Sequence, residues 1–108
     1  MTRLFLLQRA TAVILVPLVL GHLALILYAV RGGLSAAEIL GRTQGHAGWA
    51  LFYGLFVLAA TVHGTIGVRT IIREWTRWDG RVLDVTVITG ATVVGALGLR
   101  AVIGVTLP

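Results

Sequence analysis

Apolar residues fill three long stretches of the 108-residue chain, at about residues 4–30, 47–72 and 84–107. Each stretch reaches or exceeds the roughly 20 residues that a helix needs to cross the hydrocarbon core of a bilayer. In the first stretch Pro17 removes a backbone donor and is expected to kink the helix. The pattern therefore predicts a single all-α domain over residues 1–108, with three transmembrane helices.

A shorter amphipathic segment separates the first two spans. Residues 34–46 place Leu34, Ala37 and Leu40 among polar residues, and Ser35 followed by Glu38 forms a capping-box pattern. This segment is expected to be a short helix at the membrane interface. Because three spans leave little room for a core of their own, we expect the chain to be part of a larger helical bundle.

The composition supports a membrane protein. Apolar residues make up 57% of the chain and charged residues 12%, and the mean hydropathy is +0.96. The first apolar run lacks a small-residue cleavage site, so a cleaved signal peptide is not expected. The absence of cysteine excludes disulfides and thiolate ligands from this chain. The net charge of +5 comes from arginines that flank the spans instead of forming a patch, so nucleic acid is not an expected partner.

The distribution of arginines predicts the orientation. The amino-terminal segment, the loop after the second span and the approach to that loop hold Arg3, Arg9, Arg69, Arg73, Arg77 and Arg81. The opposite side holds Arg31, Arg42 and Arg100. Since positive charge concentrates on the cytoplasmic side, the amino terminus and the second loop are expected to be cytoplasmic.

His63 is the first candidate for chemistry, because a histidine within a lipid-length helix is costly unless it pairs, binds a metal or lines a pathway. Helical spacing places Gly67 above His63, with Arg69 about 9 Å further along the axis. An iron ligand, a glycine that admits a flat macrocycle and a cation at propionate depth would all suit a haem. A histidine that only hydrogen-bonds between packed helices is the alternative.

His22 is the second candidate, and its depth differs from that of His63. His63 lies roughly 14 Å from the inner end of its span, and His22 lies roughly 12 Å from the outer end of its own. Two axial ligands of one haem lie at nearly the same depth, so the two histidines are not expected to share an iron. If both are ligands, they serve two haems, each completed by a histidine from another chain. An interhelical hydrogen bond is the alternative for His22. His46 is expected to be a solvated interfacial residue, with a role in proton exchange as the alternative.

Two segments together resemble a known family. His63-x-x-x-Gly67-x-Arg69, followed by an acidic and an aromatic residue at Glu74 and Trp75, is similar to the second-helix signature of the membrane-anchor subunits of succinate dehydrogenase and fumarate reductase. The segment Gln8-Arg9-Ala10-Thr11-Ala12 resembles the first-helix His-Arg-x-Ser/Thr-Gly pattern of the same family. The chain departs from these patterns at Gln8, Ala12 and Glu74, and has Phe5 where many quinone sites have serine.

The resemblance implies roles for individual residues. His63 corresponds to the axial ligand of haem b, Arg69 to a cation beside the haem propionates, and Arg9 to the arginine near the quinone site. His22 is similar to the first-helix histidine of the anchors that hold two haems between two subunits. Gly67 corresponds to the glycine of the second-helix signature.

The resemblance also implies an assembly. The chain would be a non-catalytic subunit that carries electrons between an iron–sulfur subunit and membrane quinone. Its partners would be a second membrane-anchor subunit, the iron–sulfur subunit and a flavoprotein subunit, and its location the bacterial inner (cytoplasmic) membrane. Either reaction direction, ubiquinone or menaquinone, and one haem or two all fit the sequence.

Two other functions remain open on the sequence. One is the cytochrome b anchor of another respiratory oxidoreductase, such as a hydrogenase or formate dehydrogenase, for which more spans and more histidines are expected. The other is a haem-free membrane assembly or transport subunit, in which the histidines serve helix packing.

Overall fold

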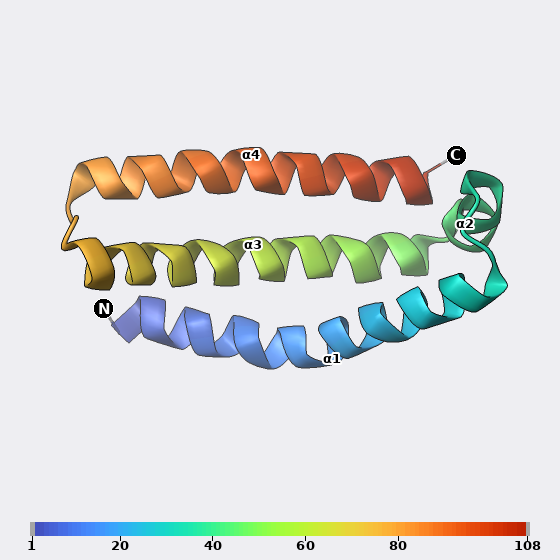
Figure 1. Cartoon of the computed structure of the whole chain (residues 1–108), viewed down its shortest axis with the longest axis horizontal. Helices are drawn as coiled ribbons and strands as arrows, with labels where there is room; N and C mark the ends of the chain where they lie inside the picture. The colour runs from blue at the N-terminus through green and yellow to red at the C-terminus, as the bar shows by residue number, and fades with distance from the viewer. Residues whose placement is uncertain (1, 108) are drawn as a thin grey trace.

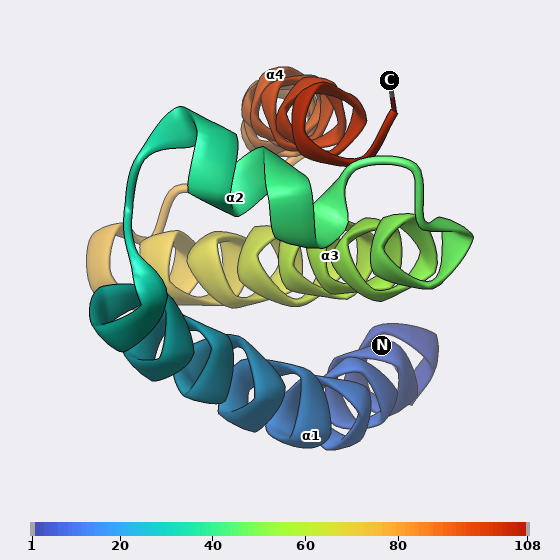
Figure 2. The same ribbon diagram turned by 90° about the vertical axis from the view of Figure 1, so that its right-hand side faces the viewer.

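The computed structural model describes residues 2–107, which form helices α1 (Thr2–Gly32), α2 (Ala36–Thr43), α3 (Ala47–Thr76) and α4 (Arg81–Thr106). Helix α3 lies between α1 and α4, and α2 crosses one end of the bundle (Figures 1 and 2). The three long helices are apolar enough to cross a membrane. The predicted all-α fold, with three spans and a short helix between the first and second, is confirmed.

The bundle has two ends that differ in structure. The amino-terminal end carries the start of α1 and the α3–α4 loop, and the α2 end carries α2 and the carboxyl terminus (Figure 1). The molecule is 47 Å long, which exceeds the hydrocarbon core of about 30 Å, so the bundle is long enough to cross it. Helix α1 is bowed along its length and contains Pro17, in agreement with the predicted kink.

Helix α2 begins with the predicted capping box. The Ser35 hydroxyl accepts a hydrogen bond from the Glu38 backbone N–H at 3.1 Å and donates one to the Glu38 carboxylate at 2.9 Å. Just before it, Gly33 turns the chain with φ +118°, and a Cβ there would lie 1.0 Å from Glu38 Oε2. Only glycine fits this turn. At the other end of α2, the Thr43 hydroxyl donates to the Val105 carbonyl at 2.6 Å, which fastens α2 to α4.

Helix α3 is longer than its apolar pattern predicts. The span was expected to end near residue 72 and to be followed by a charged loop over residues 73–81, but α3 continues to Thr76. The loop covers only residues 77–80, and Arg77 ends the helix in the left-handed conformation with φ 60°. Hydropathy marks where lipid contact ends, whereas the helix continues into the polar interface because arginine and glutamate are good helix formers.

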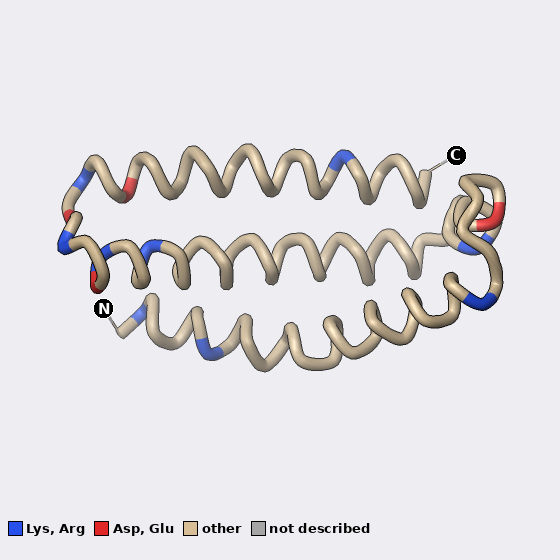
Figure 3. The backbone as a smooth tube through the Cα atoms, viewed as in Figure 1, with Lys and Arg blue, Asp and Glu red and all other residues tan. Residues whose placement is uncertain are grey.

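The core of the chain is thin. Within residues 2–107 the buried apolar side chains are Leu18, Ala59, Leu83 and Val87. Most large apolar side chains along the spans are exposed, as expected where lipid or another subunit covers them. The charged residues gather toward the two ends, which leaves the middle of the bundle uncharged (Figure 3). The chain is a multi-pass membrane protein.

Glycines set the distance between α3 and α4. A Cβ at Gly98 would lie 2.8 Å from Val57 Cγ1, and one at Gly95 would lie 3.4 Å from the Thr61 methyl carbon. Small residues of this kind allow transmembrane helices to approach closely.

Candidate functional site

His63 faces α1 from the middle of α3. Its Nδ1 atom lies 3.2 Å from the hydroxyl oxygen of Thr11, which is only 6% exposed. The same hydroxyl lies 2.9 Å from the carbonyl oxygen of Leu7 and 3.0 Å from that of Gln8. Nδ1 of His63 therefore makes a hydrogen bond across the α1–α3 interface. The other ring nitrogen, Nε2, has no hydrogen-bond partner within residues 2–107.

Glycines lie next to His63 in two directions. Gly67 packs against α1, where a Cβ would lie 3.4 Å from Gln8 Nε2. The Gln8 side-chain oxygen is buried and has no hydrogen-bond partner within the described residues. Gly64 instead borders an apolar groove of about 390 Å³ between α3 and α4, and a Cβ at Gly64 would meet nothing within 4 Å. The unpartnered Gln8 oxygen thus belongs to α1, the helix that His63 faces, whereas the open space beside Gly64 lies toward α4.

Arg69 is engaged in an ion pair between helices. Its Nε donates to Asp84 of α4 at 2.6 Å, and its Nη2 lies 3.9 Å from the Asp79 carboxylate. Asp79 also lies 3.6 Å from Arg73 Nε. The structure therefore joins Arg69 to the α3–α4 loop and to α4. It does not join Arg69 to His63, whose ring faces α1.

His22 lies between α1 and α3 in a different environment. Its ring packs edge-on against Phe56, with centroids 4.9 Å apart, and against Tyr53, with centroids 6.4 Å apart. Within residues 2–107 the structure records no hydrogen bond to the His22 ring. The adjacent Gly21 packs against Phe52, whose ring carbons would lie 3.3 Å from a Cβ at that position.

A cavity of about 490 Å³ opens beside His22 toward the α2 end. All four helices contribute to its wall, which consists of His22, Ile39, Thr43, Tyr53, Phe56, Val57, Ala60, Gly98, Ala101, Val102 and Val105. The wall is mostly apolar, and its polar side chains are His22, Thr43 and Tyr53.

The two histidines lie at different levels of the bundle. His22 follows Thr11, the residue level with His63, by about three turns of α1, or roughly 16 Å. Along α3, Phe56 is two turns before His63, which gives roughly 10 Å. The depth difference predicted from the sequence is therefore present, and both rings lie at the α1–α3 interface.

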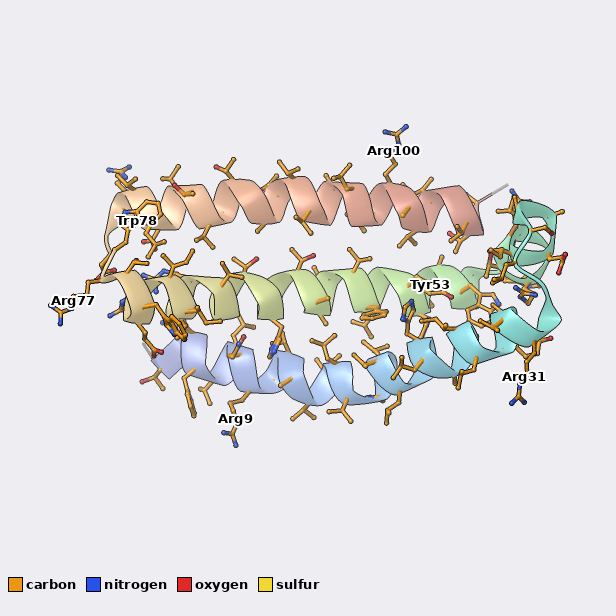
Figure 4. All side chains as sticks on the ribbon, in the orientation of Figure 1. Arg9, Arg31, Tyr53, Arg77, Trp78 and Arg100 are labelled. Atoms are coloured by element: carbon orange, nitrogen blue, oxygen red, sulfur yellow. The ribbon has the colours of Figure 1, made fainter. Side chains whose placement is uncertain are left out.

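Arg9 and His46 lie apart from these two environments. The Arg9 guanidinium lies 5.6 Å from the centroid of the Phe5 ring and points away from α3 (Figure 4). His46 precedes α3 at the α2 end, is exposed and makes no side-chain capping hydrogen bond. The exposed position of His46 agrees with the predicted interfacial residue.

Several contacts of the candidate site residues were not predicted from the sequence. Thr11 was part of the first-helix motif but had no assigned role, and the partners Asp84 and Phe56 were not identified. The histidine at position 63 is a signal for a polar partner, because an intramembrane imidazole needs one. Thr11 carries no such signal by itself, because a threonine in a helix ordinarily donates to the carbonyl of the preceding turn. To pair Thr11 with His63, one must also know how α1 and α3 are aligned along the bundle. The sequence does not show this alignment, because the α2 segment lies between the two helices.

These features define the class of the protein: a three-span helical membrane protein with an intramembrane histidine at each of two depths. The family model described as succinate dehydrogenase/fumarate reductase transmembrane subunit matches residues 1–105, and the chain belongs to that family. Family membership makes it one subunit of a succinate dehydrogenase or fumarate reductase complex. No curated protein and no solved structure gives a significant match.

Proposed function

We propose that the chain is a haem b-binding membrane anchor that passes electrons between an iron–sulfur subunit and membrane quinone. The observation that carries this proposal is the contact between His63 and Thr11, which occupies Nδ1 and leaves Nε2 without a hydrogen-bond partner among residues 2–107. An intramembrane imidazole with one nitrogen fixed and the other available has the form expected of an axial ligand.

The residues around His63 fit a haem. Residues 2–107 contain no group of three or more His, Cys, Asp or Glu side chains that could hold a metal ion. A haem iron needs no such group, because the porphyrin supplies the equatorial ligands and the protein only the axial ones. His63 would hold the iron on one side, and a histidine of the second membrane-anchor subunit on the other. A bound haem b would supply a reversible one-electron iron couple.

A second haem at His22 is part of the same proposal. His22 lies at another level of the bundle and borders an apolar cavity, and its ring nitrogens have no hydrogen-bond partner within residues 2–107. Such an imidazole needs a partner from outside the chain, because an unpaired polar group in a membrane interior is costly. A second iron, completed by the partner anchor, would meet that need.

The quinone role of Arg9 rests on the family motif. The exposed Arg9 side chain near the amino-terminal end of α1 is available for a polar contact beyond this chain. We expect Arg9→Leu to lower quinone-coupled turnover of the complex while succinate oxidation with an artificial acceptor survives. Equal loss of both activities would assign Arg9 a structural role.

The membrane orientation rests on arginine counting. It places the amino-terminal end of the bundle on the cytoplasmic side of a bacterial inner membrane, where the iron–sulfur and flavoprotein subunits would bind. A reporter fused after Pro108 would then lie outside, and one inserted at residues 77–80 inside. The reverse pattern would overturn this orientation.

A haem-free membrane subunit is the second candidate function. The same hydrogen bond between Thr11 and His63 favours it, since that contact alone could serve to pack α1 against α3. An optical spectrum of the purified complex separates the two functions. Haem b ligated by two histidines is low-spin and has absorption bands in the visible range, which a haem-free subunit lacks.

The decisive experiment substitutes His63. In a haem-binding anchor, His63→Ala should abolish one low-spin b-type signal while the subunits still assemble. The matched control is His46→Ala, which removes an exposed histidine at the α2 end and should leave the spectrum unchanged. Wild-type complex without haem, or His63→Ala with full low-spin haem content, would contradict the proposed function.

A further inference from the structure

Thr11 is placed to control which nitrogen of His63 is free. Its hydroxyl is nearly buried and contacts three groups: His63 Nδ1 at 3.2 Å and the carbonyl oxygens of Leu7 and Gln8 at 2.9 and 3.0 Å. A hydroxyl has one hydrogen to donate and two lone pairs to accept with. The assignment of that one hydrogen therefore determines the tautomer of the imidazole.

Two arrangements of the hydrogen can be compared. If Thr11 donates to Nδ1, the site contains one side-chain hydrogen bond and the proton of His63 lies on Nε2. If Thr11 instead donates to a helix carbonyl, it can also accept from Nδ1–H, and the site contains two hydrogen bonds. Carbonyl oxygens only accept, so they suit the second arrangement. Because a buried polar group gains from each bond that it makes, the second arrangement is favoured.

Other threonines of the bundle make the same bond to their own helix. Thr92, for example, donates to the Ile88 carbonyl four residues earlier at 2.9 Å, the same distance as in Thr11. Donation to the preceding turn is thus the ordinary state of a threonine in these helices. The distinctive feature of Thr11 is that its remaining lone pair meets an imidazole of another helix.

We propose that Thr11 is a positioning residue that holds His63 as the Nδ1–H tautomer and so presents Nε2 to the haem iron. This inference rests on the proposed function and extends it to a residue of a different helix. A hydrogen bond from Nδ1–H fixes the ring orientation and makes the ligating nitrogen a stronger donor. A stronger donor stabilises ferric iron, so the bond to Thr11 lowers the midpoint potential of that haem.

The test uses the intact complex with two variants at Thr11. Thr11→Val keeps the shape of the side chain and removes the acceptor, and it should raise the midpoint potential of the His63 haem and weaken haem retention by about 10- to 100-fold. Thr11→Ser restores the acceptor and should return both quantities toward wild type. Thr92→Val, which removes a threonine hydroxyl with the same helix bond but no histidine, should change neither.

A second measurement uses the wild-type complex, so that the test of Thr11 does not depend on whether a variant is stable. After exchange into D₂O, pulsed EPR of the His63 haem should show that the deuteron on the nitrogen that does not bind iron is hydrogen-bonded, through a reduced deuterium quadrupole coupling. A deuteron at that nitrogen without a hydrogen bond, or a Thr11→Val potential equal to wild type, would overturn the role of Thr11 alone. Failure of the proposed function is distinguishable, because it would appear in wild-type complex as missing haem.

Discussion

The two histidines of the α1–α3 interface are held by different kinds of contact. His63 is fixed by a directional hydrogen bond between its Nδ1 and a buried hydroxyl, whereas His22 packs in T-shaped contacts against two aromatic rings, Phe56 and Tyr53. Tyr53 lies on α3 near the α2 end (Figure 4). Each histidine has a glycine nearby at the same interface, Gly67 on α3 for His63 and Gly21 on α1 for His22.

The difference shows that two kinds of contact can fix the orientation of a histidine ring, but only one of them also fixes its tautomer. A hydrogen bond at Nδ1 selects a tautomer as well as an orientation. T-shaped aromatic contacts restrict the plane of a ring through packing, but they do not determine which nitrogen carries the proton. If both histidines bind haem iron, the two irons therefore have ligands of different donor strength, and their midpoint potentials are expected to differ.

The largest effect is expected from removing one histidine at a time. His22→Ala should eliminate one haem b and leave the signal that depends on His63, because the two rings lie roughly 10–16 Å apart along the bundle. Haem quantification and a potentiometric titration of each variant would check this. A single haem in wild type that survives His22→Ala would make His22 a packing residue and the chain a one-haem anchor.

A smaller effect is expected when the glycine next to each histidine is replaced by a larger residue. Gly67→Val would press on the Gln8 amide and Gly21→Val on the Phe52 ring, because even a Cβ lies within 3.4 Å of those groups. Overpacking of this kind costs about 1–3 kcal/mol. Gly67→Val should therefore broaden or shift the His63 haem signal, and Gly21→Val that of His22.

The two glycine variants are informative together because each is expected to alter only the haem signal of its neighbouring histidine. EPR spectra of the two variants should each show one altered and one unaltered low-spin signal. Gly64→Val offers a control for volume alone on α3, since a Cβ there meets nothing within 4 Å among the described residues. If both signals change in both variants, the two histidine environments are not independent.

The fold could be predicted from the sequence because its physical causes are local. The length of each apolar run, the capping box at Ser35 and the proline at position 17 each act within a few residues. The end of α3 was placed too early for a related reason. Hydropathy reports contact with lipid, and the charged turn up to Thr76 remains helical outside it.

The candidate site could be predicted only in part. His63, Gly67 and Arg69 share one helix, so their spacing follows from the helical repeat. Thr11 and Asp84 belong to other helices, and their meeting with α3 depends on the register between helices, which no short motif encodes. The sequence thus indicated which side chains need a partner, while the packing of α1 and α4 on α3 determined the partners.

The smallest effect concerns Arg69, the cation that the motif associates with haem propionates. Its Nε donates to Asp84 at 2.6 Å, and the Asp84 side chain is 45% exposed. An ion pair that is partly open to solvent contributes about 0.2–1 kcal/mol. Asp84→Asn should accordingly lower the thermal midpoint of the complex by a few degrees at most, with the haem content unchanged.

Arg69→Gln then distinguishes the two roles of the arginine. If Arg69 serves mainly to join α3 to α4, Arg69→Gln and Asp84→Asn should have similar effects, and the double variant should be little worse than either single one. If Arg69 also contacts a propionate of the His63 haem, Arg69→Gln alone should lower that haem's midpoint potential, because a nearby positive charge favours the reduced iron. A midpoint potential unaffected by Arg69→Gln would leave Arg69 with the structural role only. Thr11, which sets the donor strength of His63, would then be the residue of this chain that tunes the potential of that haem.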